Sequence, residues 1–198
     1  MQDKFVVGIT GGIASGKTVL STCLSERGAY IIDADLISRD VIRLPEVQAA
    51  IKAAFPTVFW PGGDVDRTAL RAVVFDDEGK RLRLNEIMHP AILTEIRKKI
   101  DEAPQKLVYI VVPLLFEAGY DTLCHYIVTI VADEQKRISR LLNRDTISEE
   151  LAVKIMRAQI SESERITGAN EVIVNNDTPE AFARRAEELH EKMLEMAK

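Results

Sequence analysis

Five short runs of hydrophobic residues, rich in β-branched side chains, are spaced along the chain. They cover residues 4–10, 29–33, 107–112, 126–131 and 171–175. Each run has the length of a strand and is either continuously apolar or alternates with a period of two, which predicts β-structure. We therefore expect five short strands.

Apolar positions with a period of 3.6 lie between and after these strands. They predict helices over residues 16–27, 90–102, 133–143, 148–159 and 179–196. Pro90 and Pro179 suit the first position of a helix, and Ser148 and Thr178 suit N-caps. Strands that alternate with helices and are nearly all apolar indicate a parallel sheet covered on both faces. The predicted fold class is α/β with a five-stranded parallel sheet.

Residues 36–103 interrupt this alternation. They contain helical patterns at 45–55, 67–75 and 77–88 and a loop at 56–66, but no clear strand. We expect a mostly helical insertion over about 36–103, within a core formed by residues 1–35 and 104–198. An alternative for the loop is a small hairpin in which residues 58–60 pair with Val65.

The composition of the chain excludes several classes of protein. The 198 residues are 46% hydrophobic and 29% charged, which fits one compact globular unit. With 26 basic against 31 acidic residues the net charge is −5, so a nucleic-acid partner is not expected. Cys23 and Cys124 have neither disulfide-framework nor zinc-site spacing.

Neither a membrane span nor an export signal is visible in the sequence. The longest apolar run, residues 107–116, is about half of the roughly 20 residues that a membrane helix needs. The N-terminus lacks the basic start and long apolar region of a signal peptide. We expect a cytoplasmic protein without a membrane partner, and the sequence leaves both a monomer and a trimer open.

A glycine-rich loop follows the first predicted strand directly and opens the first predicted helix. Its sequence, GGIASGKT, is a complete GxxxxGKT motif. Such a loop turns backbone N–H groups inward beside a helix N-terminus and holds the β- and γ-phosphates of a nucleotide. Lys17 is expected to bridge these phosphates, and Thr18 to place its hydroxyl on Mg²⁺. The predicted cofactors are ATP and Mg²⁺, and the predicted binding residues are Gly11, Gly12, Ile13, Ala14, Ser15, Gly16, Lys17 and Thr18.

Other strand ends narrow the class of nucleotide-binding protein. The chain lacks the DxxG and NKxD elements of a GTPase, and the strand at 107–112 is followed by Pro113 instead of a metal-binding Asp. The second strand ends in Asp33-Ala34-Asp35, which lies beside the phosphate loop if the first two strands have neighbouring C-terminal edges. Two carboxylates in this spacing suit one on the metal and one on a substrate hydroxyl. The alternative for Asp33 is to cap the helix that begins at Ala34.

Three arginines share one face of the helix predicted after the fourth strand. Arg137, Arg140 and Arg144 stand at positions i, i+3 and i+7. Such a face can close over transferring phosphates, neutralise developing charge and exclude water. The alternative is an ordinary solvated arginine face.

Taken together, these segments resemble the dephospho-coenzyme A kinase family over essentially the whole chain. The resemblance rests on GITGGIASGKT at 8–18, IDADLISRDV at 32–41, His89-Pro90, VPLLFEAG at 112–119, RLLNRD at 140–145, Gln159 and ANEVIVN at 169–175. It implies a P-loop kinase with a core sheet, a helical acceptor-binding domain and a lid at about 137–160. The implied reaction transfers the ATP γ-phosphate to the ribose 3′-hydroxyl of dephospho-CoA, giving CoA and ADP.

The resemblance also implies roles for single residues. Asp35 is the first choice for the carboxylate that orients or deprotonates the 3′-hydroxyl; Asp33 is the reserve and the expected metal ligand. Arg140 matches a lid arginine with a part in catalysis. Arg144 and Asn175 are expected to contact the nucleotide. The residues expected to contact the acceptor are Arg39, His89, Leu115, Phe116 and Glu117. Ala14 replaces a Gly common in this loop, which is tolerable if its φ is negative.

Two other functions compete with this hypothesis. Kinases of small metabolites, such as the shikimate and gluconate kinases, also pair a phosphate loop with DxD after the second strand. They tend to lack a long helical insertion, and the Gly-Glu-x-x-Phe-Arg element of shikimate kinases does not occur in this chain. A low-turnover nucleotide-binding switch has no need of paired carboxylates and an arginine face.

Overall fold

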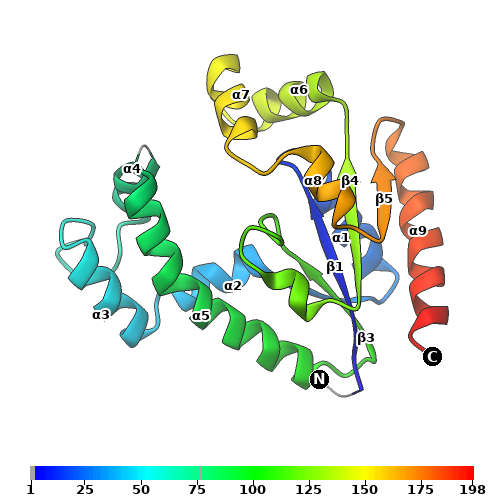
Figure 1. The fold of residues 1–198 in the computed structure, drawn as a ribbon, viewed down its shortest axis with the longest axis horizontal. Helices are drawn as coiled ribbons and strands as arrows, with labels where there is room; N and C mark the ends of the chain where they lie inside the picture. Colours follow the sequence, from blue (N-terminus) through cyan, green and yellow to red (C-terminus); the bar gives the residue numbers. More distant parts are fainter. Residues whose placement is uncertain (1–2, 76) are drawn as a thin grey trace. The chain divides into compact units, whose positions relative to one another are not determined.

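The computed structural model describes residues 3–75 and 77–198, and its centre is a five-stranded parallel sheet (Figure 1). The order of strands is β2-β3-β1-β4-β5, with parallel pairing of β1 with β3, β1 with β4, and β4 with β5. Their bounds are Phe5–Gly11 for β1, Tyr30–Asp33 for β2, Leu107–Val111 for β3, Tyr126–Val131 for β4 and Glu171–Val174 for β5. The predicted α/β class and all five predicted strands are confirmed.

The first two strands along the chain are not neighbours in this sheet. Strand β3 lies between β2 and β1, so the condition of neighbouring edges, on which the sequence argument about Asp33 and Asp35 depended, is not met. The carboxyl ends of parallel strands nevertheless lie at one edge of the sheet, where α/β proteins bind their ligands. The ends of β1 and β2 therefore share an edge, one strand apart.

The chain divides into two compact units. The first contains the residues up to Ile32 together with Ile100–Lys198, and the second contains Asp33–Lys99. Besides the sheet, the first unit includes helices α1, α6, α7, α8 and α9. Their bounds are Lys17–Glu26, Glu134–Arg144, Glu149–Arg157, Glu162–Thr167 and Pro179–Met196, and a 3₁₀ turn covers Tyr120–Leu123. The predicted caps Ser148 and Thr178 accept N–H groups at the starts of α7 and α9.

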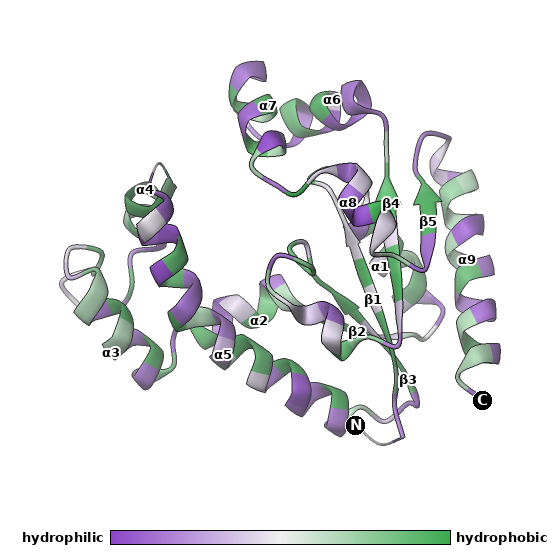
Figure 2. Ribbon diagram, viewed as in Figure 1, coloured by the Kyte–Doolittle hydropathy of each residue, from purple (hydrophilic) through white to green (hydrophobic). Residues whose placement is uncertain are grey.

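The core of the first unit lies between one face of the sheet and the helices α1 and α9. Alternate residues of β1, Val7 and Ile9, pack there with Leu20 of α1 and Phe182 of α9, all of them buried. Figure 2 shows hydrophobic residues along β3 and β4, whereas α9 alternates between hydrophobic and hydrophilic positions. The apolar side chains that recur every 2 residues in the strands and every 3.6 residues in the helices thus pack together in one layer.

The second unit is largely helical. It contains α2 at Ala34–Val41, α3 at Pro45–Ala54, α4 at Arg67–Phe75 and most of α5, which covers Glu78–Glu102 and belongs to this unit up to Lys99. The loop before α4 contains an antiparallel bridge between Phe59 and Val65, with the N–H of Trp60 donating to the carbonyl of Asp64 at 2.9 Å. The small-hairpin alternative for this loop is therefore the correct one.

Helix α5 continues through Pro90, so the predicted helix start at this proline is wrong. Proline lacks an N–H donor and usually ends or kinks a helix. Here an apolar stripe at i+4 spacing runs past it, with Met88, Ile92, Ile96 and Ile100 all buried. Burial of this continuous stripe outweighs the hydrogen bond lost at Pro90.

No helix within residues 3–75 and 77–198 is both long enough and apolar enough to cross a membrane.

Candidate active site

The phosphate loop joins β1 to α1 and is closely packed by side chains from other segments. A Cβ atom at Gly12 would overlap the guanidinium of Arg137, and one at Gly16 would overlap the side-chain amide of Asn175. Lys17 folds back over the loop, where its Nζ donates to the carbonyls of Gly11 at 2.7 Å and Gly12 at 3.0 Å. The loop glycines are thus required by close contacts, and the Lys17 ammonium lies at the loop itself.

Ala14 has a left-handed backbone with φ of 59°, so the condition of a negative φ, under which alanine is tolerable here, is not met. It is the single non-glycine residue with positive φ in the described part of the chain. The left-handed region costs an L-residue about 1–2 kcal/mol because Cβ approaches the following carbonyl. Such a conformation persists only where the surrounding structure determines it.

Side chains from distant segments hold three successive loop residues. Arg137 Nε of α6 donates to the carbonyl of Ile13 at 3.0 Å, and Gln159 Oε1 accepts the N–H of Ile13 at 2.9 Å. Arg140 Nη1 lies 3.4 Å from the carbonyl of Ala14. Asn175 Nδ2, after β5, donates to the carbonyl of Ser15 at 2.7 Å, and Arg140 Nη2 donates to the carbonyl of Asn175 at 3.0 Å.

The predicted arginine face divides into two parts. Arg137, which is 8% exposed, and Arg140 bond to the phosphate loop. Arg144, in the last turn of α6, pairs instead with Asp145 at 2.8 Å, and its side chain is 60% exposed. The hydrogen bond to Asp145 raises the pKa of Arg144. The structure therefore brings Arg140 and Asn175 to the loop, whereas Arg144 makes its bond outside it.

A second buried arginine, Arg165, lies on the short helix α8 and was not expected from the sequence. Its Nη2 is 3.4 Å from the carbonyl of Ile160 and 3.7 Å from Glu117 Oε1. Nearby, Arg137 Nη1 is 3.7 Å from Glu162 Oε2. Burial lowers the pKa of both arginines, but a guanidinium stays charged near neutral pH.

The signal that could have revealed α8 is its capping box. Ser161 and Glu164 bond reciprocally at the start of this helix, and the pattern S-x-x-E is visible in the sequence. The helix has only six residues, which is too short for a periodic pattern to identify. Arg165 follows the capping Glu164 directly.

The predicted acceptor residues of the first unit make contacts inside that unit. Glu117 Oε1 accepts the N–H of Ile160 at 3.3 Å in addition to its ion pair with Arg165. Leu115 is fully buried in the core. The ring of Phe116 packs against Gly168 so closely that a Cβ there would lie 2.7 Å from it. In this structure all three residues contact other residues of the first unit.

The predicted residues of the second unit lie at the start of α2 and in α5. Asp33 caps α2, because its Oδ1 accepts the N–H groups of Asp35 at 2.8 Å and Leu36 at 3.2 Å. The capping alternative for Asp33 is thereby confirmed. The side chains of Asp35 and Arg39 are exposed one helical turn apart, and His89 is half-buried, which lowers its pKa.

The residues predicted for Mg²⁺ offer hard oxygen donors. Thr18 presents an exposed hydroxyl at the first turn of α1, and Asp33 has a second carboxylate oxygen besides the capping one. Mg²⁺ usually keeps several waters and takes one or two protein oxygens together with substrate phosphates. Among residues 3–75 and 77–198, no three or more His, Cys, Asp or Glu side chains form a metal cage. Each of these donors, taken within its own unit, suits a metal that is held mainly by phosphates.

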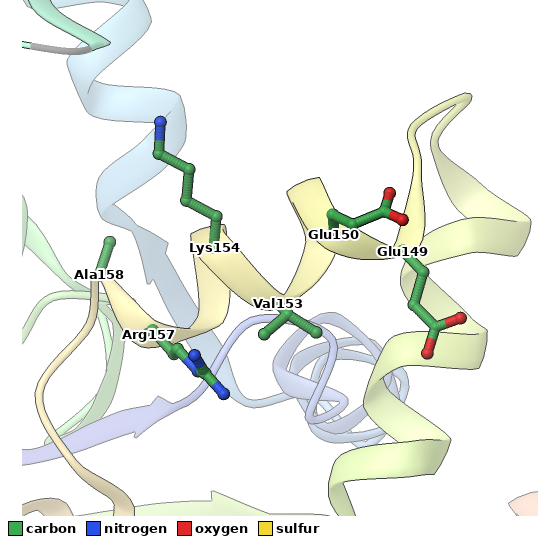
Figure 3. Close-up of a pocket in the computed structure, with 6 residues that line it drawn as sticks. All are labelled: Glu149, Glu150, Val153, Lys154, Arg157 and Ala158. Carbon is green, nitrogen blue, oxygen red and sulfur yellow. The ribbon is translucent and has the colours of Figure 1, made fainter.

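A separate hollow of about 770 Å³ lies along α7 (Figure 3). Its charged residues are Glu149, Glu150, Lys154 and Arg157, and Figure 3 shows Lys154 and Arg157 pointing to opposite sides of the helix. In a catalytic site, the polar side chains converge on the position of the ligand. These side chains diverge, so the candidate site is the phosphate loop and not this hollow.

Comparisons with known proteins identify the family of this chain. Residues 5–180 match the model of the dephospho-CoA kinase family. The dephospho-CoA kinase of Fusobacterium nucleatum is 37% identical over 183 residues, which cover 92% of this chain and 95% of that protein. The crystal structure of TT1252 from Thermus thermophilus is similar with a TM-score of 0.84 at 28% identity, covering 96% of this chain and 97% of that one.

A second solved structure supports the fold. The dephospho-CoA kinase from Campylobacter jejuni has a TM-score of 0.71 at 22% identity, with 95% of this chain and 96% of that chain covered. The family match covers residues 5–180, which include the loop, α6 and α8. This chain belongs to the dephospho-CoA kinase family.

Proposed function

We propose that this protein transfers the γ-phosphate of ATP to the ribose 3′-hydroxyl of dephospho-CoA, giving CoA and ADP. The observation that carries the proposal is the match of residues 5–180 to the dephospho-CoA kinase family. An intact GxxxxGKT loop, held in place by side chains of α6 and of the segment after α7, supports it.

The loop and two basic side chains would bind the phosphates. The N–H groups at the start of α1 and the ammonium of Lys17 meet the β- and γ-phosphates. Arg140 is bonded to the same loop and would neutralise the charge that develops on the transferring group. A role on the nucleotide is less well supported for Arg144 than for Arg140, because the side chain of Arg144 pairs with Asp145.

Asp35 is our choice for the carboxylate that acts on the acceptor hydroxyl. Oδ1 of Asp33 is engaged by two backbone N–H groups, whereas the exposed carboxylate of Asp35 lies in the first turn of α2. A carboxylate at hydrogen-bond distance from the hydroxyl can orient it or accept its proton. Asp33 and Thr18 would hold Mg²⁺, which neutralises charge on the phosphate oxygens when bound.

The second unit would bind the acceptor. It is largely helical and contains Arg39, one turn after Asp35, and His89 of α5. Arg39 offers a cation for the phosphates of dephospho-CoA, and a half-buried imidazole offers a hydrogen bond. In the first unit, Leu115, Phe116 and Glu117 of the segment after β3 are also proposed to contact the acceptor.

Measurement of ADP release with different acceptors tests the proposal. The purified protein is supplied with MgATP and either dephospho-CoA, shikimate, gluconate or no acceptor. We expect ADP release that depends on dephospho-CoA, with CoA as the second product. Release with shikimate or gluconate would favour the small-metabolite kinases, and equally slow release in all four samples would favour the switch.

A further inference from the structure

Both polar backbone groups of Ile13 are bound by side chains from outside the phosphate loop. Gln159 Oε1 accepts its N–H at 2.9 Å, and Arg137 Nε donates to its carbonyl at 3.0 Å. The two bonds fix the peptide planes on either side of Ile13. Arg137 binds the plane between Ile13 and Ala14, from which φ of Ala14 is measured, and Gln159 binds the plane before it, between Gly12 and Ile13.

We propose that Gln159 and Arg137 are positioning residues, which hold Ala14 in its left-handed conformation and thereby shape the loop for the nucleotide. This proposal rests on the proposed function. Ala14 has φ of 59°, a conformation that alanine disfavours and that its surroundings must determine. If the peptide before Ala14 rotates, the N–H groups that follow no longer point together at a phosphate.

The segment that carries Gln159 is itself anchored. It joins α7 to α8, and the next residue, Ile160, bonds through its N–H to Glu117 and through its carbonyl to Arg165. Arg137 is steadied by Glu162 of α8, whose carboxylate lies 3.7 Å from its Nη1. The backbone that carries Gln159 is therefore anchored directly after this residue.

The lack of charge on the Gln159 amide also favours the binding of an anion at the loop. It supplies an acceptor oxygen without the negative charge of a carboxylate, which would repel nucleotide phosphates. Arg137 adds a positive charge at the next peptide, between Ile13 and Ala14. The pair thus orients the two peptides on either side of Ile13 and keeps the local charge favourable to an anion.

The test replaces Gln159 by Met, which keeps the length of the side chain and removes the acceptor. Gln135→Met is the matched control, because Gln135 is exposed on α6. Affinity for MgADP is measured by titration, and KM is measured for ATP and for dephospho-CoA. We expect Gln159→Met to weaken MgADP binding and raise the KM of ATP by about three- to tenfold, the effect of one hydrogen bond. The KM of dephospho-CoA should stay unchanged.

The same substitution in an Ala14→Gly background separates positioning from general packing. Glycine adopts a left-handed φ without help, so the loss caused by Gln159→Met should shrink to about twofold or less. An equal loss in both backgrounds, or no loss in either, would overturn the proposal. If Gln159→Met melts at a much lower temperature, Gln159→Ala is measured in both backgrounds by the same criterion.

These measurements also distinguish failure of the positioning proposal from failure of the proposed function. The MgADP titration needs no acceptor and no turnover. A parent protein that binds MgADP but does not phosphorylate dephospho-CoA would contradict the function alone. A parent that turns over, with Gln159→Met binding MgADP as the parent does, would contradict the positioning role alone.

Discussion

The phosphate loop and the start of α2 hold their functional residues in opposite ways. Loop residues 13–15 are bound by side chains far away in sequence: Gln159 is 146 positions from Ile13, and Asn175 is 160 positions from Ser15. The start of α2 is held locally, by Asp33 capping its own helix and by Ser38 Oγ donating to the carbonyl of Asp35 at 2.8 Å. Substitutions around the loop should therefore act through the tertiary structure, and substitutions in α2 through local structure and charge.

Lys17→Ala should cause the largest loss of activity. We expect turnover to fall by about a hundredfold or more, because the variant lacks a cation on the transferring phosphate. Thermal unfolding should stay near that of the parent, since the hydrogen bonds of Lys17 to the carbonyls of Gly11 and Gly12 are local to its own loop. Lys98→Ala, at an exposed position of α5, is the control. Activity within about threefold of the parent would contradict the phosphate-loop assignment.

The two carboxylates of α2 should differ in what they affect. Asp35→Asn is expected to lower kcat by about a hundredfold, the lower part of the range for general-base help, while MgATP still binds. Asp33→Asn should keep the helix, because Asn also caps, but should raise the Mg²⁺ concentration needed for half-maximal activity. Single-turnover rates and Mg²⁺ titrations measure both. A dead Asp33→Asn beside a nearly normal Asp35→Asn would reverse the assignment.

Substitution of Arg140 and of Arg144 tests which of these two arginines of α6 acts on the transferring phosphate. Arg140→Ala should lower kcat by about ten- to a hundredfold, more than it raises the KM of dephospho-CoA, since hydrogen bonds to charged groups are strong. Arg144→Ala should change kcat by less than about threefold, because exposed ion pairs contribute little. Steady-state kinetics of both variants decide the point. Equal losses would show that the whole arginine face acts on the phosphates.

The smallest effect concerns the backbone of the loop. Ala14→Gly should stabilise the protein by about 1 kcal/mol, or roughly 2–4 °C in Tm, because glycine tolerates the left-handed φ. Gly119→Ala is the reciprocal control, with φ of 68° and open space around a new Cβ, and should destabilise by a similar amount. Calorimetry of both variants measures this. A lower Tm for Ala14→Gly would mean that the surroundings favour the methyl group over the relief of strain.

The elements predicted well from the sequence are those set by local pattern. The loop motif, the strand before it and the helix after it are contiguous, so periodicity and glycine spacing were sufficient. The bonds of Arg137, Gln159 and Asn175 to the loop could not be predicted in this way, because they join segments that only the tertiary fold brings together. Pro90 was misjudged for the same reason, since the burial of its helix is a property of the folded protein.

Pro90 divides α5 into two halves that should exchange their amide hydrogens separately. Proline has no N–H, so the carbonyl of Glu86 lacks its helical donor, while the hydroxyl of Thr94 donates to the carbonyl of Pro90 at 2.9 Å. The ladder of hydrogen bonds is interrupted near the middle of a 25-residue helix. Opening needs the least free energy at such an interruption. In deuterium exchange, residues 78–89 and 91–102 should therefore show different protection, although they form one continuous helix.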